Sequence, residues 1–242
     1  LIHDIAKHPE KYRYNENENM RSNGERVWVA WTNKVIQERD GRIAEILCIG
    51  TDITERRRAR ELLATRLRYE AGLAACSQTL LTDAADSLTE SLGHLLHAAD
   101  IGRICIFENF EDSHDELCVR MTHEFCAPGV KSEKENPVLQ HFSYKKNGFI
   151  RWQNMLSAGH SVSGHVDSFP HSEQKFLKSL DVLSILAIPI MAEGQWYGLI
   201  TFDDTIKIRE WEKEDIRLLG TGAEMIGGYI ERKRADAAIR KS

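Results

Sequence analysis

A chain of 242 residues is long enough for one large or two small domains, and its 42% hydrophobic and 29% charged residues exclude a disordered chain. Its formal net charge of −5 argues against a nucleic-acid-binding protein, which is usually basic. No apolar run is long enough for membrane insertion, no signal-peptide pattern is present, and the five cysteines include no C-x-x-C pair, so we expect a cytoplasmic protein with reduced thiols.

The first quarter of the chain predicts a small antiparallel sheet. A polar edge strand is expected over 12–21, a central strand rich in β-branched and aromatic residues over 26–38, and a third strand over 43–53. Asn23-Gly24 and Asp40-Gly41 are hairpin turn signals between them. Three strands need a cover on one face, so we expect that cover to come from outside this sequence or from a partner.

A long helix is predicted over 54–82, with Asp52 capping its start as in a capping box with Glu55. Leu62, Tyr69 and Leu73 lie on an apolar stripe with three-four spacing. The Arg-rich first half is too polar to be buried in one core, which favours a homodimer joined along this stripe. The alternative is a helix that packs on its own domain.

The remainder predicts an α+β domain, an antiparallel sheet with helices at both ends and loops across one face, rather than alternating βαβ units. A helix over 83–100 is expected to be capped by Asp83 or Asp86, and a second helix over 172–180 by Ser172. A long loop over 127–147 and a short helix within 148–164 separate the strands. The expected strands are 101–110, 117–125, 166–169, 182–192 and 195–203, and a final helix covers 211–239.

The final helix carries a second apolar stripe that includes Ile226 and Ile230. The stretch 231–235, ERKRA, nearly repeats ERRRA at 55–59, at the same place after a predicted sheet domain. A charge run alone is usually a solvated helix face. Its recurrence favours the same helical coupling between neighbouring domains at both places. We therefore expect a C-terminal output domain to follow in the same chain.

Two segments resemble known families. Residues 21–63 resemble the C-terminal half of a PAS domain, with its Asp-Gly turn and the terminal run Asp52-Ile53-Thr54-Glu55-Arg56. Residues from about 66 to 234 resemble a GAF domain, on the strength of SILAIPIMAEGQWYGLITFDD over 184–204 and Arg-Glu-Trp over 209–211.

The resemblance divides the chain into 1–53 as part of a PAS domain, 54–82 as a connecting helix shared with the GAF domain, 66–230 as the GAF domain and 231–242 as the start of an output-linking helix. It implies a sensory fragment of a bacterial signalling protein, most often a sensor histidine kinase. Alternatives are the sensor half of a diguanylate cyclase and a ligand-free dimerisation or relay module. The cyclic-nucleotide and bilin signatures of GAF relatives are absent. The ligand and any cofactor therefore stay unidentified.

No catalytic residue is predicted, because no P-loop, G-x-S-x-G or H-E-x-x-H pattern is present and none of the ten histidines has a phosphoacceptor setting. Cys105, Cys118 and Cys126 show no arrangement for cysteine catalysis. No metal site is predicted either: His160, His165 and His171 have no metal-ligand spacing. Asp203 and Asp204 are expected to be structural, one capping a turn or pairing with Arg209.

A small-molecule pocket is expected between the sheet and its covering loops, since such sites combine aromatic side chains with a few polar groups. The candidate lining residues are Phe125, Trp152, His165, Phe169 and Trp196.

Overall fold

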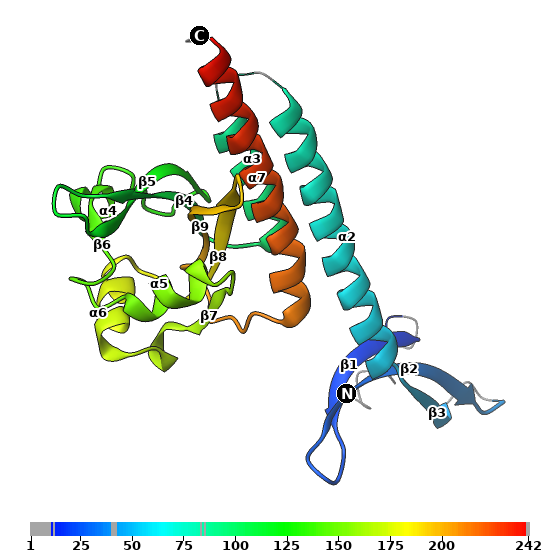
Figure 1. Cartoon of the computed structure of the whole chain (residues 1–242). Coiled ribbons are helices and arrows are strands. Elements are labelled where there is room, and N and C mark those ends of the chain that lie inside the picture. Colours follow the sequence, from blue (N-terminus) through cyan, green and yellow to red (C-terminus); the bar gives the residue numbers. More distant parts are fainter. Residues whose placement is uncertain (1–10, 12, 40–42, 83, 85, 241–242) are drawn as a thin grey trace. The chain divides into compact units, whose positions relative to one another are not determined.

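The computed structural model describes residues 11, 13–39, 43–82, 84 and 86–240. The chain divides into two compact units, Leu1–Arg66 and Leu67–Ser242, each with its own antiparallel sheet. Helix α2, Thr54–Leu81, contributes residues to both units (Figure 1). The α+β class that the sequence predicts is therefore confirmed.

The first unit holds a three-stranded sheet in the order β1-β2-β3, as predicted. Its strands are β1 (Tyr14–Met20), β2 (Arg26–Gln37) and β3 (Ile43–Asp52). At the first turn, Gly24 adopts a φ of +86°, which glycine tolerates without steric cost. The predicted turn at Asp40-Gly41 lies outside the described residues. Apolar side chains on β3 are solvent-exposed in this chain, Leu47 by 48% and Ile49 by 56%, as expected for a sheet that needs a further cover.

The start of α2 is attached to the central strand of this sheet through Trp28. The Thr54 hydroxyl accepts a hydrogen bond from the Trp28 backbone N–H at 2.9 Å, and the Arg57 guanidinium lies 3.7 Å from the Trp28 ring centroid. Asp52 accepts a hydrogen bond from the Thr54 backbone N–H at 2.9 Å, which satisfies one free donor of the first turn, as the predicted cap requires.

The second unit is built on a six-stranded sheet in the order β6-β5-β4-β9-β8-β7, with every neighbouring pair antiparallel. Four long strands match the predicted ones closely. The strand predicted over 166–169 is wrong: pairing with β8 stops at His165, and the chain then forms a short 3₁₀ turn, η1 (Val166–Ser168). The strands are β4 (Arg103–Glu111), β5 (Leu117–Cys126), β6 (Phe142–Ser143), β7 (Val162–His165), β8 (Ser184–Ala192) and β9 (Gln195–Asp204).

The remaining helices are α3 (Ser87–Ala99), α4 (Pro137–Gln140), α5 (Ile150–Ser157), α6 (His171–Ser179) and α7 (Lys213–Ile239). Two predicted caps differ. Asp86 precedes α3 but its side chain makes no cap hydrogen bond, and Ser172 lies inside the first turn of α6, where its hydroxyl donates to the Gly148 carbonyl. Asp83 lies outside the described residues. No helix in the described part of the chain is long and apolar enough to cross a membrane.

The six-stranded sheet separates two apolar cores, and strand alternation assigns residues to each. On β8, Leu186, Ile188 and Ile190 face the core formed with α2, α3 and α7, which we call the helical core. Ile185 and Ala187 face the opposite core, formed with α4, α5 and α6, which we call the loop-side core. Figure 1 shows α3 and α7 on one side of this sheet and α5 and α6 on the other.

Most of the residues predicted to form a dimer interface are instead buried in the helical core. Tyr69, Leu73, Ile226 and Ile230 are all buried in it, because the second half of α2 and most of α7 pack on their own domain. The second half of α2 therefore follows the alternative prediction, a helix that packs on its own domain. Leu62 is different, since it is 64% exposed.

Helix α7 approaches the sheet closely at Gly227. A Cβ atom at this position would collide with the carbonyl oxygen of Met191 on β8, so glycine is required for this spacing. The missing side chain at Gly227 therefore allows α7 to pack directly against β8 at this point.

Candidate functional site

A cavity of about 60 Å³ lies in the loop-side core, between the sheet and helices α4, α5 and α6. Nearly all of its lining is apolar, and aromatic side chains supply much of it. The lining residues are Phe107, Val119, Leu139, Phe142, Tyr144, Phe149, Trp152, Phe176, Leu177, Leu180, Val182, Ile185, Leu199, Thr201 and Asp203.

The aromatic wall of the cavity is held by edge-on ring contacts and by one buried carboxylate. The Phe149 ring lies 5.2 Å from the Trp152 ring, and Trp152 lies 6.3 Å from Phe169. The Trp152 indole N–H donates to Glu173 at 2.9 Å, and Glu173 is 1% exposed and also paired with Arg151. A hydrogen-bonded indole cannot rotate freely, so this wall has a defined shape.

One end of the cavity is polar, because strand β9 directs Thr201 and Asp203 toward it. Asp203 is 4% exposed, and its Oδ2 accepts a hydrogen bond from the Arg103 Nε at 3.1 Å. Its Oδ1 is buried without a hydrogen-bond partner among the described residues. Burial raises the pKa of Asp203, although the guanidinium of Arg103 and the nearby Thr201 hydroxyl oppose that rise.

Arg103 joins this polar end to the segments that cover the cavity. Besides Asp203, it donates to the carbonyl oxygens of Lys131 at 3.4 Å and Leu180 at 3.1 Å. Burial alone would lower the pKa of Arg103, but the carboxylate of Asp203 raises it above its ordinary value. The arginine therefore stays charged and holds strand, loop and helix end together.

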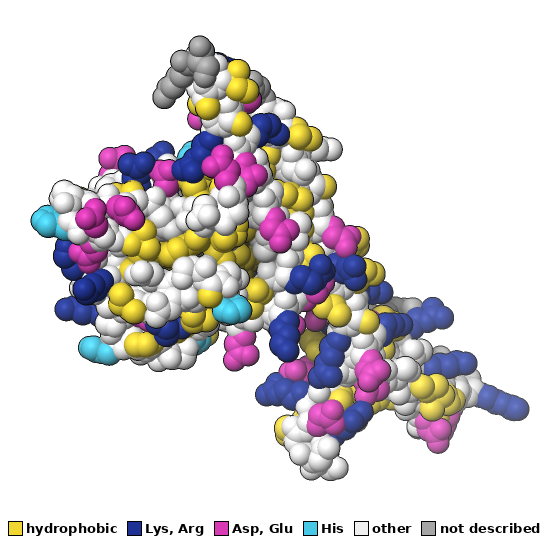
Figure 2. All heavy atoms as spheres, in the orientation of Figure 1, with side chains coloured by type: hydrophobic (Ala, Val, Ile, Leu, Met, Phe, Trp, Pro, Cys, Tyr) yellow, Lys and Arg dark blue, Asp and Glu magenta, His cyan; other side chains and the backbone are white. Residues whose placement is uncertain are grey.

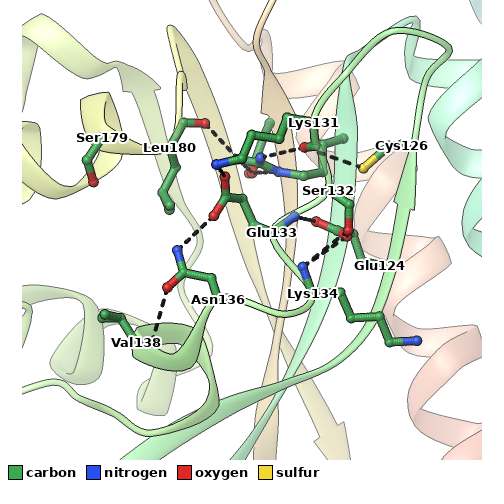
Figure 3. A network of polar contacts seen from close by, with 12 residues as sticks. Glu124, Cys126, Lys131, Ser132, Glu133, Lys134, Asn136, Val138, Ser179 and Leu180 are labelled. Atoms are coloured by element: carbon green, nitrogen blue, oxygen red, sulfur yellow. Dashed lines mark hydrogen bonds and ion pairs between the residues drawn. The ribbon is translucent and has the colours of Figure 1, made fainter.

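The loop before α4 is attached to β5 through Glu124 (Figure 3). The Glu124 carboxylate accepts hydrogen bonds from the backbone N–H groups of Glu133 at 2.8 Å and Lys134 at 3.2 Å, and from the Ser132 hydroxyl. Asn136 then caps α4 by accepting the Val138 N–H at 3.1 Å. This chain of contacts positions α4, whose Leu139 lines the cavity.

The structure brings some of the predicted pocket residues together and separates others. Trp152 lines the cavity, and the Phe169 ring packs edge-on against the Trp152 ring. Trp196 packs against the loop-side core that contains the cavity. Phe125 packs on the opposite face, against the helical core, and His165 lies in a shallow surface depression near η1, so both predictions as pocket residues are wrong.

The two consecutive carboxylates at the end of β9 serve different sides of the sheet. Asp204 has the predicted structural role: it accepts the backbone N–H groups of Ile206 and Lys207 and pairs with Arg209 at 3.0 Å. Asp203 faces the cavity. Sequence reasoning missed Asp203 and Arg103 as site residues. The available signal was a polar pair, Thr201 and Asp203, on one face of an otherwise apolar strand.

Comparisons with known proteins agree with this architecture. The family model of the GAF domain matches residues 78–230. The methanogenesis regulatory histidine kinase FilI of Methanothrix harundinacea is 31% identical over 201 residues, which is 82% of this chain and 22% of that protein. The chain therefore spans about a fifth of that relative's length.

Among solved structures, a phycocyanobilin-bound GAF domain of a cyanobacterial phytochrome superposes with a TM-score of 0.58 at 12% identity, covering 69% of this chain and 96% of that one. A domain of a two-component sensor histidine kinase protein from Sinorhizobium meliloti 1021 gives 0.50 at 18% identity, with 66% and 99% covered. At these identities the likeness establishes the fold alone.

Proposed function

Since this chain belongs to the GAF domain family, we propose that it is the sensory and regulatory part of a signal-transduction histidine kinase. The similarity to a regulatory histidine kinase supports this assignment. We place the kinase reaction in a part of the full protein outside this sequence and assign this region no catalytic role.

We also propose that the sheet of the first unit is the C-terminal part of a PAS domain; its three strands and the Asp52–Arg56 run at the start of α2 support that.

The unpartnered oxygen of Asp203 at the end of an apolar cavity carries the proposal of ligand sensing. A buried acceptor without a hydrogen bond is costly, and a ligand that donates to it removes that cost. The ligand we propose is small and mostly apolar, with one N–H or O–H group. A cavity of about 150 Å³ is large enough to bind benzene. The cavity in this structure, at about 60 Å³, must therefore widen before it can bind a molecule of that size. It does not fit a molecule the size of a bilin.

The alternative is a ligand-free relay module, and the small volume of the cavity favours it. The two functions differ in one respect. A sensor gains stability when a suitable molecule binds, whereas a relay does not, because only binding to the folded state shifts the unfolding equilibrium.

Filling the cavity should abolish ligand binding. Val182 lines the cavity, and we expect Val182→Phe to occupy the space that the ligand needs. Native mass spectrometry of the freshly purified protein should show a bound small molecule that is absent from this variant. A thermal-shift screen of small aromatic amines and phenols should find compounds that raise the melting temperature of the wild type alone.

The matched control is Val138→Phe on α4, where the side chain is 47% exposed and outside the cavity. It should keep both the bound molecule and the thermal shifts. Absence of any bound molecule and of any shift in the wild type would favour the relay instead.

We propose that the chain forms a homodimer through the exposed side of α2. Leu62, Leu63 and Leu67 are 64%, 57% and 55% exposed, and residues four apart such as Leu63 and Leu67 are neighbours on a helix. Figure 2 shows hydrophobic side chains on the surface along α2, among charged ones. A second copy of the same helix is the occupant that matches a repeating apolar stripe.

Leu63→Asp with Leu67→Asp should halve the mass measured by light scattering, because two buried charges on each helix oppose association. Ile206→Asp, a change at a residue 68% exposed in a loop, is the control and should leave the mass unchanged. A wild-type protein that is monomeric at all concentrations tested would refute the dimer.

The cysteines support a non-catalytic domain in a reducing compartment. All five are free. Burial raises the pKa of Cys105 well above its ordinary value and that of Cys126 to about 11, which is the opposite of what a nucleophilic cysteine needs. Free thiols are typical of the cytoplasm, where we place the protein.

A further inference from the structure

Three side chains of metal-binding chemistry meet at the start of β5, next to the turn that precedes it and the segment before β6. The ligand atoms of Asp112, Cys118 and His141 all lie within 4.8 Å of one another. In the described part of the chain, this is the one such group of three or more. It is separate from the histidines at 160, 165 and 171 that the sequence analysis weighed and rejected.

The surrounding structure positions each of the three side chains. Asp112 Oδ1 accepts the backbone N–H groups of His114 at 2.8 Å and Glu116 at 3.0 Å, which leaves Oδ2 available. Cys118 is fully buried on β5, opposite Ser143 of β6. The His141 ring, just before β6, packs edge-on against Phe110 at 5.2 Å. Supporting contacts of this kind orient ligands in metal sites.

We propose that Asp112, Cys118 and His141 bind a divalent transition-metal ion of the zinc type. A thiolate, an imidazole and a carboxylate are the donor set that zinc prefers, whereas calcium and magnesium require oxygen ligands. The three residues come from the β4–β5 turn, from β5 and from the segment before β6, so the ion would join these elements.

Binding would draw the three ligand atoms, now within 4.8 Å of one another, closer together around the ion. Bonds of about 2.0–2.3 Å in a tetrahedral site place the ligand atoms about 3.3–3.6 Å apart. His141 Nε2 and Asp112 Oδ2 are 3.8 Å apart. His141 is 56% exposed and is free to make this adjustment.

Lys146 is the competing cation at this site. Its ammonium is 3.9 Å from Asp112 Oδ2 and 2.6 Å from Glu116. Because Glu116 remains its partner, Lys146 can leave Asp112 to a metal without losing its salt bridge. The lysine side chain is 64% exposed, so little packing is lost when it moves.

The position of the site connects it to the cavity. Val119 follows Cys118 in the sequence, and Phe142 follows His141. Val119 and Phe142 pair with each other across β5 and β6, and both line the cavity. A metal ion would therefore fix the edge of the sheet at one wall of the cavity. The site does not depend on whether the cavity binds a ligand.

Titration of the metal-free protein with zinc chloride against a chromophoric chelator tests the proposal. We expect one zinc ion per chain, and the cobalt-substituted protein should show a thiolate-to-cobalt charge-transfer band. Cys118→Ser and His141→Ala should each weaken zinc binding by at least about tenfold, the lower limit for losses at supporting positions. Both should remove or shift the band.

Matched controls separate this site from incidental thiol or imidazole binding. Cys126→Ser, on the same strand, and His160→Ala should leave the affinity and the band unchanged. Lys146→Met should tighten zinc binding by removing the competing charge, whereas Lys145→Met should not. Because His141 is exposed, its alanine variant keeps the fold even if the Cys118 variant does not. Binding that is absent in the wild type, or that survives His141→Ala unchanged, would overturn the proposal.

Discussion

Replacing Arg103 with methionine will lower the free energy of unfolding of the GAF domain by about 3–5 kcal/mol, the typical cost of removing one partner from a buried ion pair. The Arg103 side chain is 2% exposed and that of Asp203 is 6% exposed, so neither charge can be solvated once the other is removed. The carbonyl oxygens of Lys131 and Leu180 also lose their donor. Urea-induced unfolding followed by circular dichroism measures the loss.

Two further variants show whether the buried pair is the cause. Arg103→Met combined with Asp203→Leu should recover most of the stability, because an apolar pair of similar volume is tolerated in place of a buried ion pair. Arg120→Met removes a pair in which Arg120 is 51% exposed, and Glu108 keeps Arg234 as a partner, so the change should cost no more than about 1 kcal/mol. Equal losses for Arg103→Met and Arg120→Met would contradict the assignment.

Asp204→Ala is expected to cost a similar amount, about 3–5 kcal/mol, because it leaves Arg209 without its buried partner. Asp204 is fully buried, and its two oxygens hold Arg209 and the backbone of the turn after β9. Arg209 in turn donates to the carbonyl oxygens of Ala99 and Asp100 at 2.7 Å each, at the C-terminus of α3. Free carbonyls at a helix end need such partners.

Lys207→Met provides the comparison, since Lys207 pairs with Asp100 where both side chains are more than half exposed. That change should cost no more than about 1 kcal/mol. Thermal unfolding should therefore separate the two variants clearly. A small effect of Asp204→Ala would show that the joint between β9 and α3 tolerates an unpaired Arg209.

Strand alternation in the sequence was sufficient to predict most of the sheet, but not the position of every side chain. Phe125 shows the reason. The pairing of β4 with β5 shifts register between Ile106 and Phe107, which face His123 and Met121. This irregularity reverses the alternation beyond Thr122, so that Glu124 faces the covering loop and Phe125 faces α3. Such a bulge has no signature in the alternation itself.

The apolar stripes of α2 and α7 show a second limit. A three-four spacing predicts that one face of a helix is covered, and it is the same for a dimer seam and for a domain core. Tyr69 and Ile226 therefore fitted both interpretations until the partner elements were known. Arg103 and Asp203 show a third limit: they are 100 residues apart, and nothing local marks one as the partner of the other.

Under the proposed sensing function, the position of Asp203 next to Asp204 sets the distance that a signal from the cavity would travel. One carboxylate borders the cavity, and the other holds the joint between β9, α3 and the segment leading to α7. Their Cα atoms are separated by one peptide unit, about 3.8 Å. In the proposed sensor, a displacement at the cavity would reach the opposite face of the sheet through a single rigid amide plane. The cavity and the joint between β9 and α3 lie on opposite faces of one sheet. The distance between them is set here by the covalent chain of β9 rather than by a series of packed side chains.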